Sequence, residues 1–475
     1  MTKALTFTVQ NPQPSNLSTG SNGDSQSPKQ KCRLGQLEFT PPTTTTATTT
    51  DTTKISLETP NFFQYTIQGL QPHLVPEVAS HLESMPPAIR VNLEGFVKDR
   101  EIPVSTEYPG KLHQFLGYPE NNSPLLLLDI YDPVILERNI KPNSKSLGVD
   151  TEGGLQRITG KGLAKIVEKY RPDIFVLPAD YVFSKIEELY EGKRVKKSVE
   201  RTKNWITEYM DTSLSQSQKP ALFVPLTGAP NETLREASVN FVKELDADGN
   251  VIDGYVISEY GIVGGYPLEK KLDMAWSSFS SLDQNKPRYM VGVSSPHDVV
   301  MSVDSAGIDL FDATYPYAVT EQGFASTYVF GDISVESRKD ETLKGHISLW
   351  ETPMFGDFGP LVPGCTCFAC QRHTRSYVHH LLMTHEMLAT VLLQIHNIHW
   401  YNNLFKAVRS SLKDGSFNEK KCAFLKNYVK QGEDGNAKYL LNELILLQSQ
   451  TISPTTKAGY KKFGRRLSED SATTA

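Results

Sequence analysis

The chain has 475 residues, of which 39% are hydrophobic and 22% are charged. This composition can build a sizeable core, so it excludes a chain that is disordered throughout. The net charge of −5 excludes a histone-like polycation. No apolar run approaches the roughly 18 residues of a membrane-spanning helix, so we expect no transmembrane segment. The length suits about three domains of about 150 residues, or one α/β barrel with extensions.

Both ends of the chain are polar. Residues 1–30 are rich in Ser, Asn, Gln, Gly and Pro, and we expect a disordered tail there. Residues 451–475 predict a second polar tail. The first residues lack the apolar segment of a signal peptide, and no arginine precedes Arg33, which argues against a transit peptide. We therefore expect an intracellular, cytoplasmic protein.

A threonine-rich run at 41–53 separates CRLGQLEF from KISLETPNFFQYTI. Both flanking segments look like strands, so the run predicts an insertion in a surface loop.

Short apolar runs that end in polar or turn residues then alternate with amphipathic segments. This alternation predicts a parallel sheet, either an open doubly wound sheet or a closed (β/α)8 barrel. No Gly-x-Gly-x-x-Gly follows the first strand, which favours a TIM-type barrel over residues 31–360. The predicted strands are 125–132, 173–180, 221–228, 253–261, 288–295 and 308–316. The predicted helices are 162–170, 194–210, 232–245, 272–282 and 296–305, the last capped by Ser295 with Pro296 and Asp298 in its first turn.

Three cysteines lie within six residues, at Cys365, Cys367 and Cys370, while Cys32 and Cys422 stand apart. Zinc prefers four tetrahedral nitrogen or sulfur ligands, so this turn leaves one ligand to be found. The residues alone leave the choice open among the histidines downstream, although a predicted helix at 379–403 could bring its far end back onto the turn. Four protein ligands would make a closed, structural site rather than a catalytic one. The candidates are His373, His379, His380, His385, His396 and His399.

Asp312 ends a predicted barrel strand in IDLFDATYPYAVTEQG. Barrel enzymes keep their chemistry at this end of the strands. A carboxylate there could attack an anomeric carbon and form a covalent glycosyl-enzyme intermediate, or it could be a structural residue that bonds a neighbouring loop.

The segment GKRVKKSVERTKNW predicts a basic helix face. Such a cluster in an acidic protein is a candidate phosphate-contacting face, and the alternative is a solvated helix face. The candidate phosphate-binding residues are Arg194, Lys196, Lys197, Arg201 and Lys203.

Four segments together resemble the tRNA-guanine transglycosylase family. They are CRLG, RVKKSVERT, DLF-x4-PYAVTEQG and PLVPGCTCFACQRHTRSYVHHLLMTHEMLATVLLQIHN. The resemblance runs from about Cys32 to about Leu444. It implies a TIM-type barrel with an inserted zinc-binding subdomain and C-terminal helices, which we place at 361–450. It also implies one structural Zn²⁺ held by Cys365, Cys367, Cys370 and His396.

The chain departs from the catalytic members of that family at three motifs. Those members follow the nucleophilic aspartate with Cys-Val-x-Pro-Thr-Arg, whereas Asp312 is followed by ATYPY. They carry a general acid/base in Asp-Ser-Gly-Gly-Phe-Gln, whereas this chain has DTEGGLQ at 150–156, either an eroded remnant or a coincidence. Their base-binding Gly-Gly-Leu is replaced by ISEY at 257–260. We therefore predict no catalytic residue.

The resemblance then implies the non-catalytic subunit of a heterodimer. Its catalytic partner, of the same fold, would exchange guanine for queuine at wobble position 34 of tRNAs with GUN anticodons. This chain would supply interface and tRNA-backbone contacts, with the zinc subdomain at the interface. The alternatives are an active transglycosylase that uses Asp312 and a zinc-dependent RNA-binding module. The resemblance also allows peripheral attachment to the mitochondrial outer membrane.

Overall fold

The computed structural model describes most of the chain between residues 31 and 429 and one segment before it. The predicted insertion at 41–53, the predicted tail at 451–475 and the end of the 361–450 region lie outside the described residues. The residues that the structure describes are 5–10, 31–40, 54–79, 82, 85–96, 108, 110–118, 123–134, 143–151, 154–182, 193–212, 219–228, 230–247, 249, 251–258, 268–292, 295–331 and 345–429.

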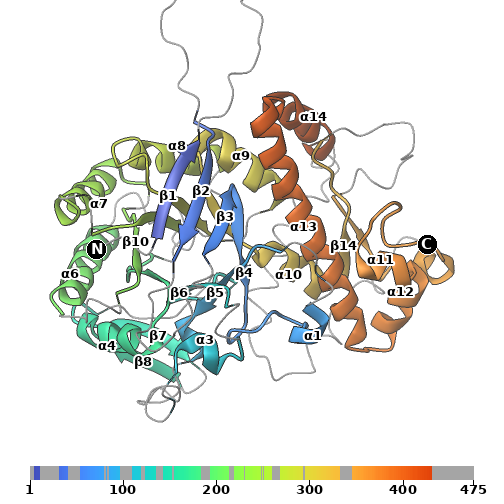
Figure 1. Ribbon diagram of the computed structural model, residues 1–475, viewed down its shortest axis with the longest axis horizontal. Coiled ribbons are helices and arrows are strands. Elements are labelled where there is room, and N and C mark those ends of the chain that lie inside the picture. The colour runs from blue at the N-terminus through green and yellow to red at the C-terminus, as the bar shows by residue number, and fades with distance from the viewer. Residues whose placement is uncertain are drawn as a thin grey trace, which may run out of the picture.

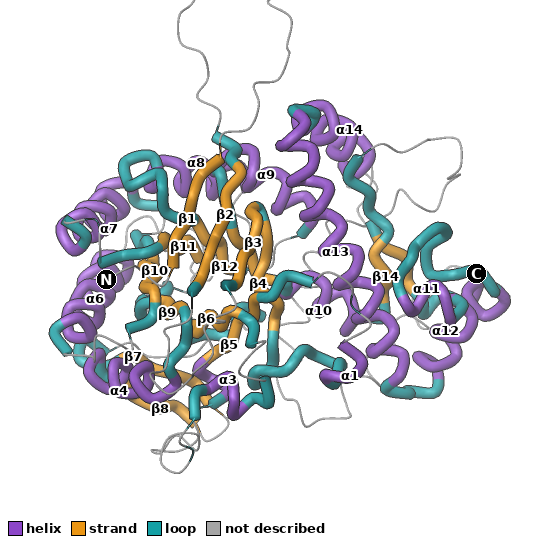
Figure 2. Tube along the Cα trace, viewed as in Figure 1, coloured by secondary structure: helices purple, strands orange, loops and turns teal. Residues whose placement is uncertain are grey.

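Eight parallel strands close into a barrel (Figure 2), which confirms the predicted TIM-type fold. The last strand pairs with the first and closes the ring. Most strand residues are buried because helices and the N-terminal sheet cover the barrel, as is usual for parallel strands. In chain order the strands are β4 (Asn61–Tyr65), β5 (Ala88–Asn92), β6 (Leu125–Asp129), β9 (Ile174–Val176), β10 (Ala221–Pro225), β11 (Gly254–Ser258), β12 (Arg288–Val291) and β13 (Leu310–Asp312).

All five predicted barrel helices are present and lie outside the strands (Figure 1). The capping prediction is also confirmed, since Ser295 accepts a hydrogen bond from the backbone N–H of Asp298 and Pro296 begins the helix. The helices are α4 (Gly160–Tyr170), α6 (Lys193–Met210), α7 (Glu232–Leu245), α8 (Leu268–Phe279) and α9 (Pro296–Ala306). Shorter helical segments follow the first two barrel strands: α1 (Pro76–Ala79) follows β4, and η1 (Leu93–Gly95) and α3 (Leu112–Phe115) follow β5.

A three-stranded antiparallel sheet precedes the barrel, with β1 (Leu5–Gln10), β2 (Leu34–Phe39) and β3 (Ile55–Thr59). The prediction of a disordered tail is therefore wrong for residues 5–10, because alternating apolar residues in LTFTVQ let β1 pair with the whole of β2. Arg33 bonds Asp309 and the carbonyl of Lys286. Both partners lie within two residues of the start of a barrel strand, so the sheet covers the N-terminal end of the barrel and leaves the C-terminal end for a site.

The metal subdomain begins earlier than the predicted boundary at 361. Its first elements are β14 (Phe324–Ser326) and β15 (His346–Ser348), which form a hairpin, and η6 (Thr352–Gly356) follows. These short elements carry no metal ligand, so no sequence signal marked them. They share a second hydrophobic core with α11 (Phe368–Arg372), α12 (Arg375–Met383) and the start of α13 (Leu388–Asp414).

The single helix predicted at 379–403 is wrong, since the chain breaks between α12 and α13. His385 has a φ of +58° in the break, a left-handed conformation that a continuous helix cannot contain. The second half of α13 packs on the barrel, with Phe405 against Phe62 and Phe311. The subdomain is thus inserted between β13 and the second half of α13, which packs against β4 and β13. Helix α14 (Phe417–Val429) ends the described part of the chain.

Candidate functional site

Four predicted ligand residues converge in the subdomain. Their ligand atoms all lie within 4.8 Å of one another. The Nδ1 atom of His396 lies 3.8, 3.5 and 3.4 Å from the sulfur atoms of Cys365, Cys367 and Cys370. A tetrahedral zinc ion, with bonds of about 2.3 Å to sulfur and about 2.0 Å to nitrogen, would place these atoms about 3.5 Å apart. The cluster therefore has the dimensions of a metal site.

Local structure orients each ligand. Cys367 is the N-cap of α11, where its sulfur accepts a hydrogen bond from the backbone N–H of Cys370. The Nε2 atom of His396 lies 2.9 Å from the carbonyl oxygen of Ser326. A carbonyl can only accept, so Nε2 carries the proton and Nδ1 is left free to bind a metal. Hydrogen bonds from Cys367 and Cys370 lower the pKa of Cys365, which favours the thiolate that metals bind.

The other candidate histidines lie outside this cluster. His373 stacks on Tyr377, with ring centroids 5.2 Å apart, and His379 bonds the carbonyl of Leu349. His399 lies beside the cluster, where its hydrogen bond also lowers the pKa of Cys365. Within the part of the chain that the structure describes, no other group of His, Cys, Asp or Glu residues could hold a metal. His396 lies in the first third of α13, and not at a helix end as the sequence suggested.

Asp312 stands at the C-terminal end of β13, as predicted, but its side chain is fully buried. The backbone N–H of Gly292 donates to one carboxylate oxygen at 2.8 Å, and the Thr314 hydroxyl donates to the other at 2.6 Å. Burial raises the pKa of Asp312 to about 6, against the opposing charge of Arg90 and these hydrogen bonds. Both oxygens are therefore engaged by the chain itself.

A second carboxylate at this end was missed. Asp129 ends β6 and pairs with Arg90 at 2.6 Å, and the same guanidinium donates to the carbonyl of Tyr131. Arg90 and Asp129 are both buried. Asp129 carried the same sequence signal as Asp312, an acid at a strand end, whereas Arg90 lies in β5, which was not predicted. The Arg90 guanidinium thus forms an ion pair with Asp129, and its charge also opposes the rise in the pKa of Asp312.

The described residues of the DTEGGLQ segment, 150–151 and 154–156, form no part of this end. They lie on an antiparallel hairpin, β7 (Leu147–Thr151) with β8 (Gly154–Ile158), outside the barrel. Asp150 is exposed there. A general acid/base must reach the reacting group, so the match of this segment to the catalytic motif is a coincidence.

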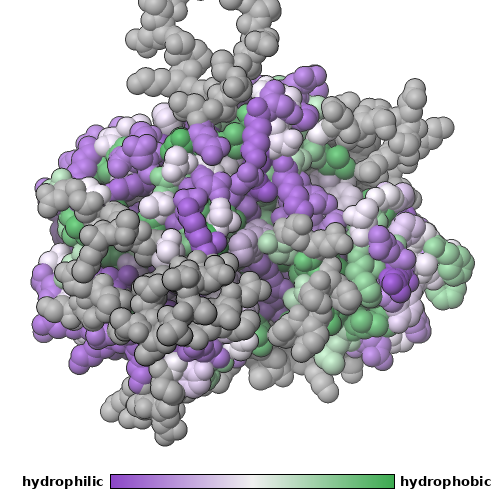
Figure 3. All heavy atoms as spheres, in the orientation of Figure 1, coloured by the Kyte–Doolittle hydropathy of each residue, from purple (hydrophilic) through white to green (hydrophobic). Residues whose placement is uncertain are grey.

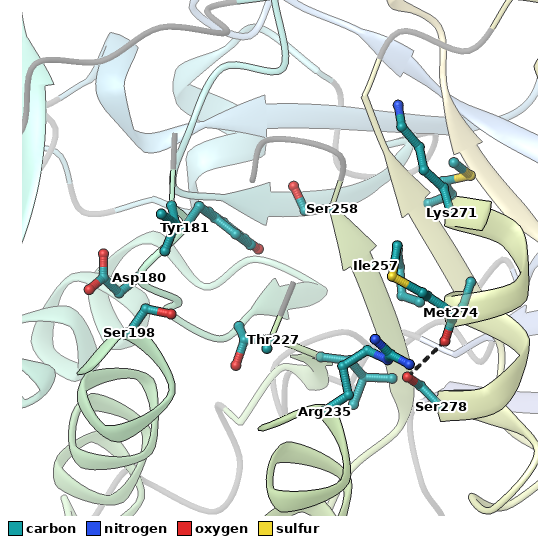
Figure 4. Close-up of a pocket in the computed structure, with 15 residues that line it drawn as sticks. Asp180, Tyr181, Ser198, Thr227, Arg235, Ile257, Ser258, Lys271, Met274 and Ser278 are labelled. Carbon is teal, nitrogen blue, oxygen red and sulfur yellow. Dashed lines mark hydrogen bonds between the residues drawn. The ribbon is translucent and has the colours of Figure 1, made fainter. Parts of the chain in front are cut away.

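The segment that replaces the base-binding motif lines a small cavity (Figure 4). Ile257 and Ser258 face it together with Asp180, Tyr181 and other residues from α6, α7, α8, β12 and the segment just after β10. Its volume is about 80 Å³. Small-molecule sites commonly measure about 300–1,000 Å³, so this cavity, as the described residues form it, is smaller than a typical site for a base. The rest of the ISEY segment, at 259–260, lies outside the described residues.

The predicted basic face of α6 divides into two groups. Arg194 forms two hydrogen bonds of 2.6 Å with Asp180, and Arg201 bonds the same carboxylate at 3.0 Å. Lys203 lies over the ring of Phe241, 5.4 Å from its centroid. These three side chains therefore have structural contacts. The two remaining predicted residues, Lys196 and Lys197, are exposed.

In the parts of the chain that the structure describes, no helix combines the length and apolar character needed to cross a bilayer.

Comparison with known proteins agrees with the fold and the cluster. The family described as "Queuine tRNA-ribosyltransferase" matches residues 33–430. A Culex quinquefasciatus protein named queuine tRNA-ribosyltransferase accessory subunit 2 is 31% identical over 401 residues, 80% of this chain and 87% of that protein. A human protein of the same name is 29% identical over 412 residues, 80% of this chain and 94% of that protein. The resemblance to the transglycosylases is confirmed, and the chain belongs to the queuine tRNA-ribosyltransferase family.

Proposed function

We propose that this chain is the non-catalytic subunit of a heterodimeric queuine tRNA-ribosyltransferase. The observation that carries the proposal is the state of Asp312, whose carboxylate is fully buried and bonded by Gly292 and Thr314. A nucleophile must reach the ribose, and this group faces its own chain instead. The names of the similar insect and human proteins, which call them accessory subunits, point the same way.

The reaction assigned to the heterodimer is the exchange of guanine for queuine at wobble position 34 of tRNAs with GUN anticodons. Base exchange requires a nucleophile, a held base and a proton donor in one place. In this chain Asp129 is neutralised by Arg90, and the cavity at Ile257 and Ser258 is small. The bond-making steps therefore belong to the partner.

We assign one structural Zn²⁺ to the cysteine and histidine cluster. Three thiolates with one imidazole are a ligand set that zinc favours, and four protein ligands leave no open position for a substrate. Zinc would link the cysteine turn to α13 and so stabilise the subdomain.

The subdomain also offers a surface for the partner. Phe355, Phe358 and Met387 are 74%, 77% and 84% exposed, which is unusual for large apolar side chains. Figure 3 shows apolar side chains gathered on the part of the surface where Figure 1 places α11 to α13. Exposed apolar clusters mark interaction sites. We define the subdomain patch as Phe355, Phe358, Tyr377, Met383, Met387 and Leu388.

We expect Lys196 and Lys197 to contact tRNA phosphates, because both are exposed cations on α6. We also propose a cytoplasmic protein that attaches peripherally to the mitochondrial outer membrane, a location that cell fractionation tests.

Co-purification with the catalytic subunit, followed by exchange assays, tests this function. We expect exchange by the mixture and none by this chain alone. Exchange by this chain alone would favour the active transglycosylase. Failure to bind the catalytic subunit, with tRNA binding retained, would favour the free-standing RNA-binding module.

A matched pair of variants tests the surface. Phe358→Asp with Met387→Asp should abolish co-purification, because it places charges in the subdomain patch. Leu155→Asp is the control, since Leu155 is 44% exposed on the distant β7–β8 hairpin. Retention of the complex by the double variant would show that the partner binds elsewhere.

A further inference from the structure

One helix contacts both the metal cluster and the end of the barrel at Asp312. The first third of α13 carries His396, and Tyr401 follows five residues later on the same helix. At about 1.5 Å per residue these two positions are about 8 Å apart along the helix axis. Figure 1 shows α13 running from the barrel to the subdomain. A change at one site is therefore within reach of the other.

Asn397, next to His396, joins this helix to the segment before the subdomain. Its side chain is fully buried. Its oxygen accepts from the backbone N–H of Ser326 at 2.8 Å, and its amide donates to Thr320 Oγ1 and to the carbonyl of Phe324, both at 2.9 Å. His396 bonds the carbonyl of the same Ser326. Two consecutive residues of α13, His396 and Asn397, thus both bind the backbone of the segment Phe324–Ser326.

That stretch follows α10 (Thr314–Glu321), the short helix that starts two residues after Asp312. Asn397 fixes the last turn of α10 through Thr320. Tyr401 stacks on Tyr315 in the first turn, with ring centroids 6.2 Å apart, and its hydroxyl lies 3.5 Å from the carbonyl oxygen of Asp312. Helix α13 therefore contacts α10 at both of its ends. The first residue of α10, Thr314, also bonds the Asp312 carboxylate, so α10 lies over Asp312.

We propose that the metal centre holds α10 in place and thereby keeps the barrel closed over Asp312. A bound metal ties His396 to the cysteine turn and so fixes the position of Asn397 on the same turn of α13. Without it, the contacts of Asn397 and Tyr401 must hold α10 alone. Metal binding at the cluster and closure of the barrel end are then thermodynamically coupled. Helix α10 is the element whose position depends on both. This inference rests on contacts within the chain and does not depend on the proposed partner.

Amide hydrogen exchange of the full-length chain tests the coupling. Three samples are compared with the zinc-loaded wild type: the chelator-treated wild type, Asn397→Ala and Lys406→Ala. Lys406 is the control, an exposed residue on the same helix. We expect amides in 310–321 to exchange at least about tenfold faster after chelation and in Asn397→Ala. Strands β5 and β6 should be unchanged, and Lys406→Ala should match the wild type.

The possible outcomes separate the proposal from simpler explanations. Faster exchange confined to 365–396 after chelation would show that the metal organises only its own ligands, and would overturn the proposal. Faster exchange throughout the barrel would show global destabilisation and would also overturn it. Zinc retention by Asn397→Ala against the chelator completes the test: faster exchange in α10 together with easier loss of zinc than from the wild type supports the coupling, whereas faster exchange in α10 with wild-type zinc retention would show that Asn397 holds α10 independently of the metal and would overturn it. Unchanged exchange in α10 of Asn397→Ala contradicts it.

Discussion

Replacement of Asp312 by asparagine should remove the loss of folding stability that the buried carboxyl causes as the pH rises. The carboxyl is fully buried, and burial raises its pKa to about 6 from an ordinary value of 3.8. A raised pKa in the folded state means that folding favours the protonated acid. The stabilisation is present below the unfolded pKa near 4 and is lost as the pH rises through the folded pKa near 6.

The magnitude follows from the size of the shift. One pKa unit corresponds to about 1.4 kcal/mol, so a shift of about two units is worth about 3 kcal/mol in the free energy of unfolding. Asparagine is neutral at every pH and fits the same space. Its oxygen can accept from Gly292 while its amide donates to the Thr314 hydroxyl. The longer hydrogen bond from the backbone N–H of Thr314 cannot then form, which costs about 1 kcal/mol at every pH. Relative to the wild type, Asp312→Asn should therefore gain about 2.5 kcal/mol between pH 4 and pH 7, because the unfolded-state carboxyl is already partly ionised at pH 4.

Urea denaturation at pH 4, 5, 6 and 7 measures this difference. The control is Asp150→Asn, because Asp150 is exposed on the β7–β8 hairpin and should show no such gain. A constant offset between Asp312→Asn and the wild type over the whole range would refute the reasoning, since it would mean that the carboxyl is solvated in the folded protein.

The remaining predictions concern the metal and tRNA. Cys367→Ser and His396→Ala should each lose zinc by elemental analysis and lower the midpoint of thermal unfolding, because structural zinc stabilises folding directly. His373→Ala should keep a full equivalent, since its ring stacks on a tyrosine outside the cluster; the reverse result for the two histidines would make the ligand assignment wrong. Lys196→Glu with Lys197→Glu should weaken tRNA binding by the heterodimer and reduce the slope of log K against log salt by about 1.5, at about 0.7–0.9 per phosphate contact. An unchanged slope would mean that this is a solvated helix face.

Strands and helices with a strong local pattern were predictable. The apolar run that ends at Asp129 and the capped start of α9 at Ser295 needed no information from elsewhere in the chain. By contrast, β5 was missed because Arg90 interrupts its apolar residues. Only the fold shows that Arg90 is neutralised by Asp129, 39 residues away, so a charged residue can lie inside the barrel.

The site was predictable to the extent that its ligands are close in sequence. The spacing of the three cysteines indicated a metal site, but the choice of His396 from the histidines needed the family resemblance, because the break at His385 changes which helix carries it. For the basic helix, charge alone could not separate Arg194 and Arg201, which bind Asp180, from the exposed Lys196 and Lys197.

Turnover by the heterodimer with Asp312→Asn in this subunit tests the central claim most directly. We expect guanine–queuine exchange to stay within about twofold of the wild type, because Asp312 makes no bond to the ribose, whereas loss of the nucleophilic carboxylate of the catalytic subunit should remove activity by several orders of magnitude. Denaturing electrophoresis of the stalled reaction should show tRNA attached covalently to the catalytic subunit only. A covalent adduct of tRNA with this chain that disappears in Asp312→Asn would contradict the non-catalytic assignment.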